Sequence, residues 1–186
     1  MIELVPRFIS DRQKFEIGES NMKFAQSRPL NTGFTTLFIC EKGWAVVRLY
    51  NKRFLFREGD ILNAYWDMCP IFEKISEDFL SYYCMMSEEF CYQIYRNMSV
   101  DFCNFAYQYP VMTPTKEQHT QLALWLKENL WLTENLADMR LYTTVKNNLE
   151  NLYIVIDSES QKILKRSPAP SCPVLGRFYV NLEAYL

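Results

Sequence analysis

The sequence contains a single histidine, His119, and this limits the chemistry open to the chain. Catalytic metal ions are usually held by several converging His, Cys and carboxylate side chains. His119 falls on the apolar face of a predicted helix, where a partly buried structural role is the simpler interpretation. We therefore expect no metal site and no cofactor.

No other group of residues favours catalysis. A Ser-His-Asp arrangement has no support in the sequence, and a Cys nucleophile paired with His119 is formally allowed but favoured by nothing nearby. The five glycines are scattered singly, so there is no Gly-rich phosphate loop. The carboxylates Glu88 and Glu89 stand at a predicted helix start, where negative charge interacts favourably with the helix dipole. The prediction is that the chain is not an enzyme.

The cysteines indicate a reducing compartment. No CxxC pair occurs, and the first residues lack the basic start and long apolar run of a secretory signal. We interpret the thiols as reduced, mostly buried groups of a cytoplasmic protein. No apolar segment is long enough to span a membrane. The six cysteines are Cys40, Cys69, Cys84, Cys91, Cys103 and Cys172.

Composition and charge limit the partners. The 186 residues are 49% apolar and 16% aromatic, which suits a globular protein with ample material for a core or a pocket. The formal net charge is −2. This argues against a nucleic-acid-binding surface on the chain itself, because phosphate contacts need clustered Lys and Arg.

The stretch from Phe34 to Met86 is predicted to form one continuous antiparallel sheet feeding a small barrel. Strands are expected at residues 34–40, 44–50, 53–56, 61–66 and 80–86, because these runs are rich in β-branched and aromatic residues and are separated by turn residues. Asn51 and Lys52 suit a two-residue hairpin turn. Residues 1–30 are expected to be an arm with one short strand near 14–17.

Helical patterns follow the strands. Ser87 suits a helix N-cap, and Thr115 with Gln118 suits a capping box. A later helix, from about 136 to 164, carries apolar residues at alternating spacings of three and four, the pattern of a packing seam. That seam packs either on the preceding helix of the same chain or on a second copy. The expected dimer contacts are Leu122, Trp125, Tyr142, Val145, Leu149, Leu152 and Ile156.

Residues 167–173 read as a linker, because three prolines in seven residues block both helix and sheet. Beyond it, Val174, Phe178, Leu182 and Tyr185 start an amphipathic helix that the end of the sequence interrupts. We expect this helix to continue in a longer protein.

Short motifs in this order resemble a known family. The turn Glu58-Gly59-Asp60 stands where cupins have Pro-Gly-Asp, Ser76-Glu77-Asp78-Phe79 precedes an aromatic strand, and Ser87-Glu88-Glu89-Phe90 opens a helix. The combination resembles the N-terminal sensor domains of AraC-type transcription regulators, particularly those of gut bacteroidetes. The resemblance covers nearly the whole chain.

The resemblance implies an α+β fold: a cupin-like antiparallel β-barrel at 31–86 and a helical, helix-hairpin dimerisation segment at 87–166. It further implies that 167–186 lead to a DNA-binding domain with two helix-turn-helix units, none of which is present in the sequence. The chain would then dimerise, sense a small-molecule effector, contact DNA only through that absent domain, and have no contact with membranes.

The barrel interior is the expected ligand site. Strand alternation places Val47 and Leu49 on one face with Phe54 and Phe56 across the hairpin, and the likeness to cupins makes this the inner face. Two alternatives stay open: a small cupin enzyme of the isomerase kind, and a dimerisation module without a ligand, whose interior is simply filled. The expected ligand residues are Thr36, Phe38, Cys40, Val47, Leu49, Phe54, Phe56 and Tyr83.

Overall fold

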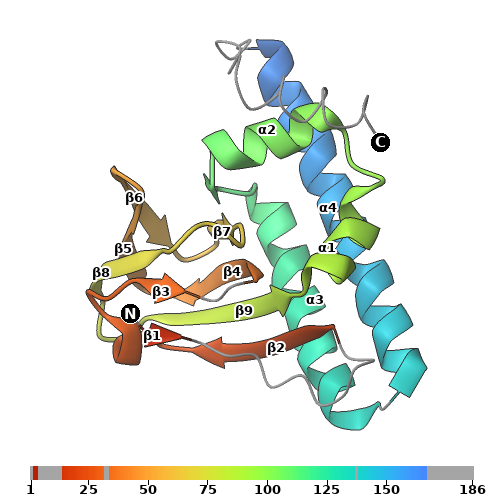
Figure 1. Cartoon of the computed structure of the whole chain (residues 1–186), viewed down its shortest axis with the longest axis horizontal. Coiled ribbons are helices and arrows are strands. Elements are labelled where there is room, and N and C mark those ends of the chain that lie inside the picture. Colours follow the sequence, from red (N-terminus) through yellow and green to blue (C-terminus); the bar gives the residue numbers. More distant parts are fainter. Residues whose placement is uncertain (1, 4–13, 32–33, 137, 167–186) are drawn as a thin grey trace.

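The computed structural model describes residues 2–3, 14–31, 34–136 and 138–166. Their fold is α+β, as predicted, with two antiparallel sheets and a helical side. The strands gather on one side of the molecule and the longest helix runs along the other (Figure 1). The predicted linker and interrupted helix, together residues 167–186, lie outside the described residues, as do residues 1 and 4–13 of the predicted N-terminal arm.

The larger sheet has five strands and lies between the smaller sheet and the helices. Both of its faces are buried in the middle, because residues 35–40 and 61–64 are all buried. Such continuously buried strands are typical of a sheet covered on both sides. Its strand order is β10 (Val111–Met112), β7 (Ile61–Ala64), β4 (Thr35–Lys42), β9 (Leu80–Met86) and β2 (Phe15–Ser20).

The smaller sheet has three strands in the order β6 (Lys52–Arg57), β5 (Trp44–Leu49) and β8 (Ile71–Ile75). A separate two-stranded parallel pair joins β1 (Ile2–Glu3) to β3 (Leu30–Asn31). The prediction of one continuous sheet is therefore wrong, because β4 and β5 follow one another in the chain but belong to different sheets. Gly43, with φ of 70°, makes the turn between them, and the Trp44 amide then bonds to the hydroxyl oxygen of Ser76 at 2.9 Å.

The β5–β6 hairpin confirms the predicted alternation. Val47 pairs with Phe54, and Ala45 pairs with Phe56, so their side chains share one face. The turn itself is shifted by one residue from the prediction. Leu49 pairs with Lys52, so the turn consists of Tyr50 and Asn51, and Tyr50 has a positive φ of 51°.

The described residues form four α-helices, α1 (Glu88–Tyr95), α2 (Val100–Gln108), α3 (Lys116–Asn135) and α4 (Asp138–Arg166), and a short 3₁₀ turn, η1, spans Lys23–Ala25. The predicted caps are confirmed. The Ser87 hydroxyl accepts from the Phe90 amide, and Thr115 and Gln118 form a complete capping box. Helix α4 packs against α1, α2 and α3. In the part of the chain that the structure describes, no helix has the length and apolar character needed to cross a membrane.

Candidate functional site

The predicted ligand residues lie on the facing sides of the two sheets. Phe38 on β4 pairs with Tyr83 on β9, and Thr36 pairs with Met85, so this face of the larger sheet looks toward the β5–β6 hairpin. Six of the eight residues are almost completely buried, and Phe54 and Tyr83 are half-buried. The six buried ones are Thr36, Phe38, Cys40, Val47, Leu49 and Phe56.

Aromatic rings occupy the space between the sheets. The ring centroids of Phe38 and Phe72 are 5.8 Å apart, those of Phe72 and Phe79 are 6.1 Å apart, and those of Phe56 and Phe79 are also 6.1 Å apart. The sequence analysis did not include Phe72 among the expected ligand residues, because it predicted no strand at Ile71–Ile75, which is β8. These ring contacts occupy part of the space that the predicted ligand residues enclose.

The polar groups of this interior already have partners within the chain. The Thr36 hydroxyl donates to the Phe34 carbonyl at 3.2 Å, and the Tyr83 hydroxyl donates to the Glu16 carboxylate at 3.2 Å. Burial, followed by the charges of Asp60 and Glu58, raises the pKa of the Cys40 thiol to about 12. Cys40 is therefore a protonated, unreactive thiol at neutral pH.

The predicted dimer seam divides into two parts. Val145 and Leu149 have no exposed surface and belong to the core. Tyr142 packs on α1, where its hydroxyl donates to Gln93 Oε1 at 2.9 Å and its ring meets Phe90 edge-on. These three residues pack within the chain. The other four, Leu122, Trp125, Leu152 and Ile156, line an open groove.

This interhelical groove, with a volume of about 870 Å³, runs between α3 and α4. Phe105, Tyr109 and the short strand β10 also line it. The Trp125 indole N–H at the groove is buried and has no acceptor among the described residues. The polar groove residues are Thr113, Glu117, Gln118, Gln121, Glu128, Asn148, Asn151 and Ser160.

Asn63 is a functional candidate that the sequence analysis missed. It sits in the buried strand β7 and has no exposed surface. Its side-chain oxygen accepts from the Tyr153 hydroxyl of α4 at 3.3 Å, and its amide donates to the Tyr95 hydroxyl of α1 at 3.4 Å. The sequence did contain a signal for Asn63, because it is the one polar residue in the otherwise apolar run Ile61–Ala64, and a buried polar residue needs a hydrogen-bond partner.

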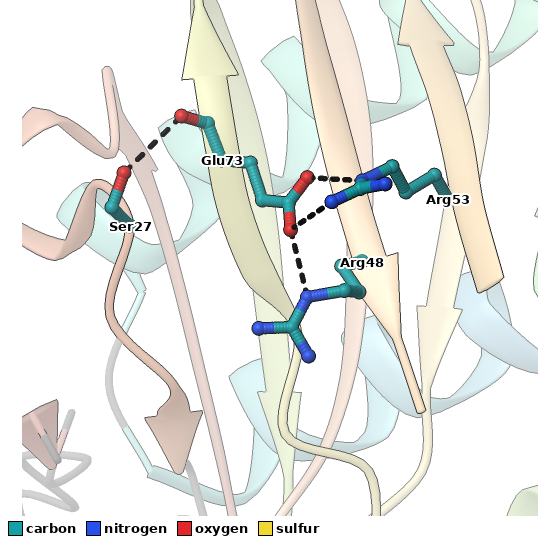
Figure 2. A network of polar contacts seen from close by, with 4 residues as sticks. All are labelled: Ser27, Arg48, Arg53 and Glu73. Atoms are coloured by element: carbon teal, nitrogen blue, oxygen red, sulfur yellow. Dashed lines mark hydrogen bonds and ion pairs between the residues drawn. The ribbon is translucent and has the colours of Figure 1, made fainter. Parts of the chain in front are cut away.

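A second polar network lies on the outer face of the smaller sheet. Figure 2 shows the Glu73 carboxylate between two guanidinium groups, with Arg48 Nε at 2.7 Å and Arg53 Nε at 2.6 Å. Ser27 donates to the Glu73 carbonyl at 3.2 Å. The hydrogen bonds from Arg53 and then Arg48 hold the pKa of Glu73 below its ordinary value. This network ties β5, β6 and β8 together on the exposed side.

The residues considered for catalysis do not converge. Half-buried His119 lies beside Gly59, where an added Cβ would come within 3.2 Å of the imidazole. Among the described residues, no three His, Cys, Asp or Glu side chains gather into a metal site. The thiols of Cys40, Cys69, Cys84 and Cys91 are free, and the side chains of Cys103 and Cys172 lie outside the described ones.

Comparison with solved structures finds proteins of similar fold. The chain is similar to the crystal structure of apo ToxT K231A from Vibrio cholerae strain SCE256, with a TM-score of 0.54, 6% identity, and coverage of 80% of this chain and 57% of that chain. It is also similar to the AraC-like transcriptional activator CuxR, with a TM-score of 0.43, 11% identity, and coverage of 76% and 49%. The chain spans about half the length of these proteins. No family model and no curated protein matches it. At this identity, the likeness to ToxT shows a shared fold.

Proposed function

We propose that this chain is the regulatory part of an AraC-type transcription regulator, which senses a small organic effector in its cupin-like interior and dimerises through its helical side. Two independent lines support the proposal: the sequence motifs that resemble AraC-type sensor domains, and the fold shared with ToxT. Contact with DNA would belong to a domain outside this chain, in a cytoplasmic protein. The chain itself would catalyse no reaction.

The observation that carries the proposal is the buried connection between sheet and helix. Asn63 joins β7 to α4 through Tyr153, and both residues have no exposed surface. Ser99 and Asp157 add a second link, from the N-cap of α2 to α4, at 2.8 Å. Because packed interiors transmit displacements, an effector that shifted the sheet would also shift α4.

The aromatic rings between the sheets also favour a second candidate function, a dimerisation module without an effector. Phe38, Phe56 and Phe72 occupy the space that an effector would need. The two candidates differ in one measurable property, which is whether a small compound raises the melting temperature by binding between the sheets.

Thermal unfolding of the chain with a panel of small organic compounds tests the effector. A compound that binds between the sheets should raise the melting temperature of the wild type and of Val46→Phe, which alters the outer face of β5. It should not stabilise Val47→Phe, which fills the interior. Val47→Ile, a smaller change at the same position, replaces Val47→Phe if that variant fails to fold. Equal stabilisation of all variants would exclude the interior as the site.

Sedimentation of the chain tests the dimer. A mass that rises toward that of a dimer at tens of micromolar is expected. The rise should be lost in Leu152→Glu, which alters the groove, and kept in Asn147→Glu, which alters an exposed position of α4 outside it. If both variants sediment like the wild type, the dimer does not use the groove.

A further inference from the structure

The interhelical groove has the form of a site for one additional helix. Its walls, α3 and α4, run antiparallel, and Asn148 of α4 donates to Asn129 of α3 at 3.3 Å near one end. On α4 the groove extends from Asn148 to Ser160, a length of about 18 Å. This length accommodates a helix of a little over three turns.

Both walls leave large apolar side chains exposed. Leu124 on α3 is 60% exposed and Val155 on α4 is 50% exposed, and both line the groove. A small compound at the bottom of the groove would leave these rims uncovered. A helix lying along the groove would cover them, as in other helix-in-groove complexes.

The chain carries a segment of matching pattern directly after α4. In a helix over residues 174–186, seven of the apolar residues would fall on one side, while Val180 and Ala184 would fall outside that stripe together with Arg177 and Glu183. The segment would be about 18 Å long as a helix. The apolar stripe consists of Val174, Leu175, Phe178, Tyr179, Leu182, Tyr185 and Leu186.

The connection is long enough to bring this segment back to the groove. From Ser160, where the groove ends, α4 continues for about 9 Å to Arg166. Residues 167–173 are able to span up to about 23 Å when extended. Val174 would therefore reach the Ser160 end, and the segment would run antiparallel to α4 toward Asn148.

We propose that residues 174–186 of this chain bind in its own interhelical groove and compete there with a second copy. A short tether gives the segment an effective concentration of the order of millimolar, above that of a second copy at micromolar concentration. The docking itself is a contact within one chain. Its regulatory meaning rests on the proposed function, because it limits dimerisation through Leu122, Trp125, Leu152 and Ile156.

Limited proteolysis of the full chain tests the docking. Trypsin cuts after Arg177, inside the segment, at a rate that follows how often the segment is free. Leu182→Glu in the stripe and Leu124→Glu on the groove wall should each speed this cleavage roughly tenfold. The matched controls are Ala184→Glu, outside the stripe, and Thr120→Glu, an exposed position of α3 that does not line the groove. Both controls should be cut at the wild-type rate. Far-UV circular dichroism verifies that each variant is folded.

Sedimentation of the same variants separates this inference from the proposed dimer. Leu182→Glu should dimerise more tightly than the wild type, because it frees the groove. Faster cleavage without a dimer in any variant would support the docked segment and remove the dimer from the proposed function. Unchanged cleavage in both Leu182→Glu and Leu124→Glu would overturn the docking, whatever the masses.

Two further outcomes would also overturn it. If wild-type protection of the Arg177 bond disappears on dilution, the groove holds the segment of a second copy. If native mass spectrometry finds a compound that co-purifies with the chain and that Leu124→Glu loses, the groove is a small-molecule site.

Discussion

The hydroxyl of Tyr153 on α4 donates a hydrogen bond to the side-chain oxygen of Asn63 on β7, at 3.3 Å, and both residues are completely buried. Ninety positions separate them in the chain. Buried polar groups destabilise a protein unless they find partners, so this pair fixes how α4 sits on the larger sheet. Tyr95 completes the cluster from α1.

Removing the Tyr153 hydroxyl should weaken the protein measurably. Tyr153→Phe keeps the ring but leaves Asn63 Oδ1 without this donor, so the free energy of unfolding should fall by about 1–2 kcal/mol. Urea unfolding at neutral pH measures it. Tyr92→Phe, on an exposed tyrosine of α1, is the matched control and should change stability little. Equal stability of the two variants would show that the hydrogen bond contributes nothing.

Alkaline pH should destabilise the fold through the same cluster. Burial raises the pKa of Tyr95 and Tyr153 above the ordinary 10.0. It also raises the pKa of the Cys91 thiol from 9.0 to about 12. The unfolded chain therefore releases these protons first as pH rises, and stability, complete below pH 9, should decline above it and faster above pH 10. Urea midpoints measured from pH 7 to 11 test this. Tyr153→Phe should show a shallower decline above pH 10.

Thiol labelling should distinguish the cysteines. Cys40 and Cys91 stay protonated at pH 8 because burial raises the pKa of each to about 12. Half-exposed Cys69 should therefore react first with a thiol reagent in the folded protein. The experiment uses a chain in which Cys103 and Cys172 are serine, and peptide mapping identifies the labelled residue. Labelling of Cys40 as fast as Cys69 would contradict the buried placement of β4.

The Glu73 network should respond to acid. Since the Arg53 and Arg48 hydrogen bonds hold the pKa of Glu73 below its ordinary 4.5, its contribution to stability is present above that pH and is lost as pH falls through the lowered value. Glu73→Gln should be less stable than the wild type at pH 7, and the difference should shrink as the pH falls below 4.5. Glu77→Gln, on an exposed carboxylate, is the control. A difference that does not change with pH would mean that charge is not the cause.

The sequence by itself determined the local features of this protein. The caps at Ser87 and Thr115 were predictable because a cap joins residues only three apart. The shared face of Val47 and Phe54 was predictable because side chains alternate along a strand and the hairpin turn is short.

Tertiary structure decided which strands pair and which helix faces stay open. No local rule assigns β4 and β5 to different sheets, because that choice depends on partners such as β9 and β8, more than twenty residues away. The apolar spacing of α4 is the same whether a residue is buried in the core or lines an open groove. Only the packing of α1, α2 and α3 against α4 decides that Leu149 is buried and that Leu152 lines the groove. Periodicity places a residue on a face, whereas the neighbours that cover that face come from distant parts of the chain.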